Sequence, residues 1–114
     1  MARRIDIILE EILEAINGID VAIAVRGLSA LDQDWLLQRG VERGIEIISE
    51  AVRHLPDDVL AKRPDMPWAE IKAIGNRIRH EYHRVSSKII ASVVVDDLPA
   101  LKVAIEKLQD DIQF

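Results

Sequence analysis

The spacing of aliphatic residues constrains the fold most, because they recur at steps of three and four along most of the chain. Such spacing places side chains on one face of an α-helix, whereas a strand requires alternation at every second residue. The first predicted helix runs from about Arg3 to Arg26 and is expected to end at Gly27. Its stripe consists of Ile5, Ile8, Leu9, Ile12, Ile16, Ile19 and Ile23.

A second long helix is predicted to begin at Ser29, which can act as an N-cap with Asp32 three residues later, and to run to about Leu55. Its apolar stripe consists of Leu31, Trp35, Val41, Ile45, Ile48, Val52 and Leu55. Gly40 and Gly44 lie one turn apart on this helix. Two explanations are open, a close approach of another helix or simple tolerance, and the sequence favours tolerance because each glycine costs only about 1 kcal/mol.

The second half of the chain is predicted to hold a proline-marked loop followed by three helices. Residues 57–61 of the loop can form one helical turn. The expected helices run from about Pro67 to Val85, from about Lys88 to Val95 after a cap at Ser86 or Ser87, and onward from a new start at Asp97 and Pro99. The last helix carries a stripe of Leu98, Leu101, Ile105, Leu108 and Ile112.

These stripes predict an all-α fold, an antiparallel bundle of four to five helices in which the first two are long neighbours. The 114 residues fit a single domain spanning 1–114. The chain has no cysteine, which excludes disulfides and thiolate metal sites. No apolar run is long enough to cross a bilayer, and acids interrupt the N-terminal segment, so we expect a soluble cytoplasmic protein with no membrane association.

Positive charge is concentrated in the third predicted helix. The net charge is −5, yet residues 75–84 carry Arg77, Arg79 and Arg84 against Glu81, a local +2 that leaves −7 for the remainder. Two of the three histidines, His80 and His83, lie in the same stretch. An acidic surface disfavours non-specific coating of nucleic acid, DNA included, but is compatible with one local phosphate site.

A helical wheel separates this third helix into an apolar and a basic face. The residues within an arc of roughly 80° are Ile71, Ile74, Ile78, Tyr82 and Val85. His80 lies about 180° from Ile71, and the other members of its polar face are Asn76, Arg77, His83 and Arg84. Arg79 lies between this face and the core edge, and Tyr82 lies about 160° from His80.

Histidine, asparagine and arginine together are suitable for cleaving RNA without a metal or another cofactor. Histidine can move the 2′-hydroxyl proton, and arginines such as Arg84 can bind the phosphate. A solvated helix face explains the same residues without any function. His80 and His83 could ligate a metal, but no third ligand is evident and the HEYH sequence is not the HExxH zinc motif, so we expect none. We interpret His54 as structural.

The segment WAEIKAIGNRIRHEYH (68–83), with VERGIEIISEAVRHLP (41–56) before it and DLPALKVAIEKL (97–108) after it, resembles the HepT-like family of the HEPN superfamily. The resemblance covers nearly the whole chain. It implies a HEPN-like helical bundle that forms a homodimer. It also implies a metal-independent ribonuclease toxin of a type VII-like toxin–antitoxin pair, with RNA as substrate and a minimal nucleotidyltransferase as antitoxin.

The family motif carries over to particular residues of this chain. Asn76 matches the polar residue of the motif, and His80 matches the histidine, which implies a general acid/base at the homodimer interface. Tyr82 matches the tyrosine to which the antitoxin can transfer AMP. Arg84 and His83 are candidates for binding RNA phosphate.

The family's arginine falls at Gly75, or at Ile74 or Ala73 with a longer spacing, and none of these is arginine. Arg79 and Arg77 are the candidates to supply its charge. Three interpretations follow: a ribonuclease toxin, a non-catalytic helical partner of a nucleotidyltransferase, and a nucleotide-binding helical bundle.

Overall fold

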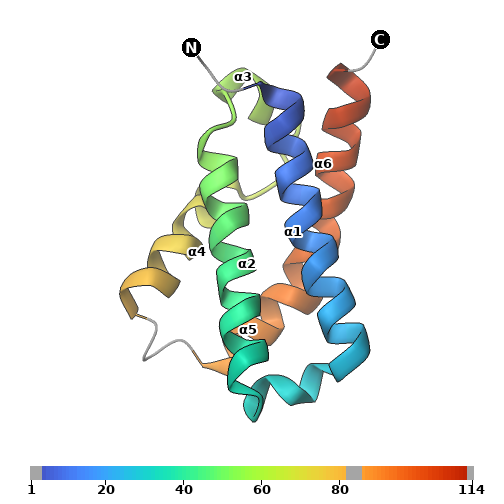
Figure 1. Ribbon diagram of the computed structural model, residues 1–114. Coiled ribbons are helices and arrows are strands. Elements are labelled where there is room, and N and C mark those ends of the chain that lie inside the picture. The colour runs from blue at the N-terminus through green and yellow to red at the C-terminus, as the bar shows by residue number, and fades with distance from the viewer. Residues whose placement is uncertain (1–3, 82–85, 113–114) are drawn as a thin grey trace.

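The computed structural model describes residues 4–81 and 86–112, and these are helical over most of their length (Figure 1). Within those residues there is no β-strand, so the all-α prediction is confirmed. The elements in order are α1 (Ile5–Arg26), a 3₁₀-helix η1 (Leu28–Asp32), α2 (Trp35–Arg53), α3 (Asp57–Leu60), α4 (Trp68–Glu81), α5 (Ser87–Ser92), a π-helix η2 (Val93–Asp97) and α6 (Leu98–Ile112).

Helices α1 and α2 form an antiparallel pair, with α6 packed along α1 and α4 packed against α2 (Figure 1). Their apolar stripes meet in one core, which removes aliphatic surface from water and provides the main driving force for folding. Fully buried members of this core are Ile8, Leu9, Ile12, Ile16, Leu31, Ile45, Val52, Ile78, Ile90, Ile105 and Leu108. Within the described ranges, no helix combines the length and the hydropathy needed to cross a membrane.

The ends of α1 and α2 show where local sequence rules hold and where they fail. Gly27 ends α1 as predicted, with a φ of 89° that favours glycine and an N–H that donates to Ile23 O at 2.7 Å. The predicted cap at Ser29 is wrong, because Ser29 lies inside η1. Asp34 caps α2 instead and accepts a hydrogen bond from Leu37 N at 3.0 Å. That backbone hydrogen bond lowers the pKa of Asp34, and nearby Arg26 contributes.

The predicted break and restart at Asp97 and Pro99 is also wrong, because α5, η2 and α6 form one continuous helical run. Proline has no N–H and cannot donate to the carbonyl four residues earlier, so an α-helix through this point would leave Val95 O without its donor. The chain widens here into a π turn, in which Leu98 N donates to Val93 O, five residues back. The cap at Ser86 is confirmed, since its side chain accepts from Ile89 N.

The two glycines of α2 prove to be different. A Cβ at Gly40 would meet no atom within 4 Å, whereas a Cβ at Gly44 would lie 2.8 Å from Ile19 Cδ1. The interpretation as tolerated glycines is therefore right for Gly40 and wrong for Gly44, which allows α1 to approach closely.

Alanine substitutions at these two glycines should have different effects on stability. Gly40→Ala is expected to raise the free energy of unfolding by about 0.5–1 kcal/mol, because alanine has the higher helix propensity. Gly44→Ala should gain less or lose stability, since its methyl group forces Ile19 to move. Urea denaturation of both variants measures the difference, and an equal gain at both positions would contradict the close contact at Gly44.

Candidate functional site

The start of α4 is fixed by the indole of Trp68, the first residue of the helix. Its Nε1–H lies 3.0 Å from Leu60 O and 2.9 Å from Arg63 O, which ties the helix to α3 and the loop after it. Pro67 precedes Trp68, and the observed start agrees with the prediction within one residue. The predicted continuation to Val85 lies outside the described residues, as do Tyr82, His83 and Arg84.

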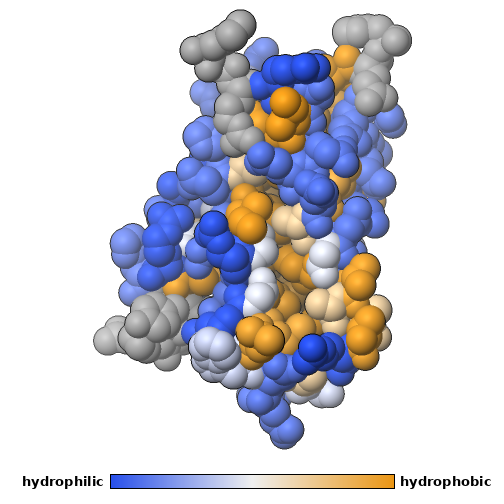
Figure 2. All heavy atoms as spheres, viewed as in Figure 1, coloured by the Kyte–Doolittle hydropathy of each residue, from blue (hydrophilic) through white to orange (hydrophobic). Residues whose placement is uncertain are grey.

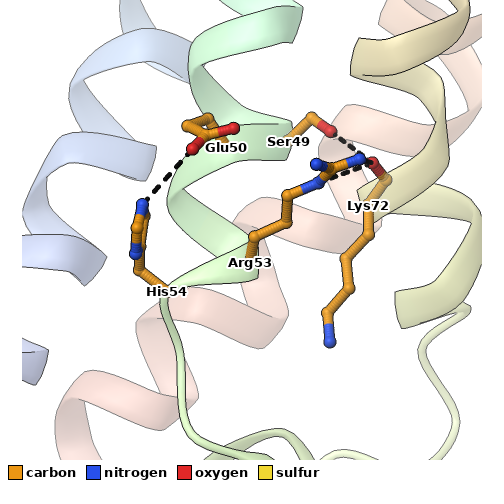
Figure 3. Close-up of polar contacts among 5 residues, drawn as sticks. All are labelled: Ser49, Glu50, Arg53, His54 and Lys72. Carbon is orange, nitrogen blue, oxygen red and sulfur yellow. Dashed lines mark hydrogen bonds and ion pairs between the residues drawn. The ribbon is translucent and has the colours of Figure 1, made fainter.

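Close contact between α2 and α4 is centred on Gly75 and on Ser49, whose hydrogen bond to Lys72 is drawn in Figure 3. Ser49 is 2% exposed. Its hydroxyl donates to Lys72 O at 2.8 Å and accepts from Gly75 N at 3.2 Å. Arg53 donates to the same Lys72 carbonyl from Nε at 3.2 Å and from Nη2 at 2.9 Å. Three α2 donor atoms thus converge on one α4 carbonyl and fix where α4 lies.

The contact between α2 and α4 requires a residue without a side chain at position 75. A Cβ at position 75 would lie 2.6 Å from Ser49 Oγ and 2.7 Å from Ser49 Cβ. The position at which the resemblance places the motif arginine is therefore filled by the Ser49 side chain. An arginine here would have to displace Ser49 or push α4 away from α2.

His80 is exposed on α4, on the side away from buried Ile78, as the helical wheel predicts. Among the described residues it has no hydrogen-bond partner, so its imidazole is accessible to a ligand. Asn76, one turn earlier, is half-buried. Both side chains belong to a helix whose opposite face is fixed in the core, which limits their movement.

Arg77 and Arg79 lie on opposite flanks of α4. Arg79 lines a hollow of about 300 Å³ together with Arg43, Glu46, Ile47 and Glu50 of α2. Arg77 lines a different groove, between α4 and the α5–η2–α6 run. The structure therefore does not bring the two arginines together beside His80.

His54 caps the C-terminal end of α2, where its Nε2 lies 3.3 Å from Glu50 Oε1 (Figure 3). This contact gives the side chain a local partner on its own helix. Within the described ranges, no group of three histidine or acidic residues is arranged to hold a metal ion.

The comparisons with known proteins identify the family. The model of the family described as "Ribonuclease HepT-like" matches residues 8–108. The chain belongs to the HepT-like family of the HEPN superfamily. It is 33% identical over 101 residues to the Thermococcus cleftensis protein "Probable ribonuclease HepT", covering 89% of this chain and 92% of that protein.

A second relative of this HepT-like chain is the Caldanaerobacter subterraneus subsp. tengcongensis protein "Putative RNase TTE0752". The two are 34% identical over 86 residues, which is 74% of this chain and 77% of the relative. No solved structure matches this chain.

Ser49 and Arg53 are the site residues that the sequence analysis missed. Ser49 lies four residues after Ile45 and three before Val52, so the helical repeat alone places it in the core stripe. A small polar residue at such a position is a signal for a close helix contact. Arg53 gave no comparable signal, because its role depends on where α4 lies.

Proposed function

We propose that this HepT-like chain is a cytoplasmic, metal-independent ribonuclease toxin in which His80 is the general acid/base. The observation that carries the proposal is the accessible imidazole at the family's motif position, on a helix held by the core. Ribonuclease names among the relatives support the same reaction class.

In this mechanism the neutral imidazole of His80 removes the proton of an RNA 2′-hydroxyl. The 2′-oxygen then bonds to the adjacent phosphorus while the bond from phosphorus to the 5′-oxygen breaks. An imidazolium returns a proton to that leaving oxygen, and the products are a 2′,3′-cyclic phosphate and a 5′-hydroxyl end. Asn76, one turn from His80, would orient the phosphate or the imidazole.

The negative charge that develops on the phosphate needs a cation, and Gly75 cannot supply it. Arg79 and Arg77 are the described candidates, one on each flank of α4. Because they lie on different sides, single alanine variants would identify the flank that binds RNA. Arg84 and His83, outside the described residues, remain proposed phosphate ligands.

An exposed apolar surface on α1 and α2 supports a homodimer. Val25 is 78% exposed, Trp35 69%, Leu36 67% and Val21 63%. Hydrophobic residues gather over this end of α1 and α2, where η1 joins them (Figure 2). Large contiguous apolar surfaces mark interaction sites, and a twofold contact needs only one such patch on each copy.

The exposed apolar surface continues along one face of α2 toward the candidate site on α4. Leu36, Gly40, Arg43 and Ile47 follow one another on α2 at steps of three and four, so they share one face. Arg43 and Ile47 also line the hollow that holds Arg79. A second copy packed on this face would lie beside α4, and the two copies together would supply two His80 side chains.

Leu36→Asp is expected to raise the dissociation constant of the homodimer by about tenfold or more, because it places a charge at the centre of an apolar contact. Size-exclusion chromatography with light scattering over a concentration series measures the change. Val95→Asp is a matched control, since Val95 is 53% exposed on η2, outside this surface. A wild-type protein that stays monomeric, or equal effects of both variants, would contradict the proposed interface.

The proposed regulation is a type VII-like toxin–antitoxin pair with a minimal nucleotidyltransferase as antitoxin. AMP transfer to Tyr82, two residues after His80 in the sequence, would add a negatively charged phosphate and so repel the RNA substrate. The intact mass of the chain after co-expression with such an enzyme tests this. Tyr82→Phe should abolish any added AMP.

The direct test of the nuclease is incubation of the purified protein with total RNA in EDTA. Wild-type protein should cleave the RNA and leave cyclic phosphate ends, and His80→Ala protein should not. Cleavage that requires an added metal ion would contradict the mechanism.

One observation favours a second function, that of a non-catalytic partner of a nucleotidyltransferase. Ser49 fills the place of the motif arginine, so the chain is adapted to packing at that position. A wild-type protein that forms a stable complex with the nucleotidyltransferase but cleaves no RNA would establish this alternative.

A further inference from the structure

A groove of about 600 Å³ separates α4 from the α5–η2–α6 run. Helix α4 packs extensively on α2 but makes little close backbone contact with α5, η2 or α6, so one flank of α4 is left open. Ile48, Leu98 and Leu101 underlie the groove. The apolar side chains that line it are only half-buried and include Ile71, Ile74, Ile89 and Val93.

The charge of this groove is opposite to that expected of a site for RNA. Its described lining holds four carboxylates, Asp65, Glu70, Asp96 and Asp97, against one cation, Arg77. Desolvation is the main cause that raises the pKa of Asp97, and the neighbouring charges of Asp96 and Glu70 raise it further, so these two carboxylates repel that of Asp97. A cation brought among them would relieve that repulsion, whereas a phosphate would add to it.

We propose that this groove binds a segment of a partner protein that carries apolar side chains flanked by lysine or arginine. The half-buried isoleucines and Val93 would contact the apolar side chains, as in the binding of an amphipathic segment to a hydrophobic groove. The carboxylates would pair with the flanking cations and select against acidic segments. The proposal does not depend on whether the chain cleaves RNA.

Two synthetic amphipathic peptides with identical leucine positions test the proposal, one with lysine and the other with glutamate at every polar position. Each is titrated into the isotope-labelled full chain and followed by NMR. The lysine peptide should bind, shift the methyl signals of Ile71, Ile74 and Val93, and bind more weakly at high salt. The glutamate peptide should not bind.

Reversing the charge of two carboxylates that line the groove provides a variant to compare with the wild-type chain. Glu70→Lys/Asp97→Lys should weaken binding of the lysine peptide by about tenfold or more and should now favour the glutamate peptide. Glu106→Lys/Asp110→Lys, which changes two exposed carboxylates of α6 outside the groove, should keep the wild-type preference. Circular dichroism of both variants establishes that the helices remain.

Three outcomes would overturn the proposal. The first is no binding of the lysine peptide to the wild-type chain. The second is equal binding of the lysine and glutamate peptides, or a preference for the lysine peptide that Glu70→Lys/Asp97→Lys does not change. The third is a single-stranded RNA oligonucleotide that shifts the same methyl signals, because the groove would then serve nucleic acid.

Discussion

His80→Ala is expected to reduce RNA cleavage by about 10²–10⁴-fold, the usual loss when a general acid/base is removed. The rate of cyclic phosphate formation in EDTA, measured with purified protein and a defined RNA, gives this factor. Because His80 is exposed and has no hydrogen-bond partner among the described residues, the free energy of unfolding should change by no more than about 0.5 kcal/mol. Loss of activity without loss of stability would show that His80 acts in RNA cleavage and not in folding.

His54→Ala is the matched control for this experiment. It removes another exposed histidine, which contacts Glu50 at the end of α2, and should leave cleavage unchanged. Equal cleavage by wild-type and His80→Ala protein would remove His80 from the mechanism. Equal loss in both histidine variants would indicate a general effect on folding or charge.

Gly75→Arg, which restores the family's arginine, is expected to lower the free energy of unfolding by about 2–4 kcal/mol. The new side chain must enter space held by Ser49, and it disrupts the two hydrogen bonds of the Ser49 hydroxyl. Thermal and urea denaturation measure the loss. Ala73→Arg, an arginine at an exposed position of the same helix, should change stability by no more than about 0.5 kcal/mol.

A double-mutant cycle identifies the cause of that loss. Ser49→Gly removes the two atoms with which a Cβ at position 75 would clash, so Gly75→Arg/Ser49→Gly should be more stable than the sum of the single effects predicts. Additive effects would show that the two positions do not compete for space. The double variant is also the appropriate protein in which to ask whether an arginine at position 75 increases cleavage.

Much of the fold follows from local pattern, because each long helix has a stripe that repeats with the helical period. The errors arise where several residues satisfy the same local rule. Ser29 and Asp34 are both good N-caps, and only the packing of η1 decides between them. Glu42 shows another limit of local pattern, since this acidic residue is only 4% exposed. Burial raises its pKa, and Arg39 lies 3.1 Å from its carboxylate.

The candidate site was predictable only in part. The wheel correctly placed His80 opposite the core face, because that placement depends on α4 alone. The separation of Arg77 from Arg79, and the contact of Ser49 with Gly75, depend on which neighbour lies on each side of α4. Those neighbours are far away in the sequence, and no periodicity within α4 reveals them.

The π turn at Val93–Asp97 rotates the C-terminal quarter of the chain relative to the position it would have in an uninterrupted α-helix. The buried isoleucine, valine and leucine residues there advance by four, four, three, four and three: Ile90, Val94, Leu98, Leu101, Ile105 and Leu108. A π turn holds about one residue more than an α turn, so it can lose that residue and leave the helix after it in nearly the same phase. Deleting one residue within α6 itself would instead rotate everything after it by about 100°, and Ile105 and Leu108 would leave the core together. Natural variation in chain length should therefore be tolerated in the loops and at this turn but not within α6.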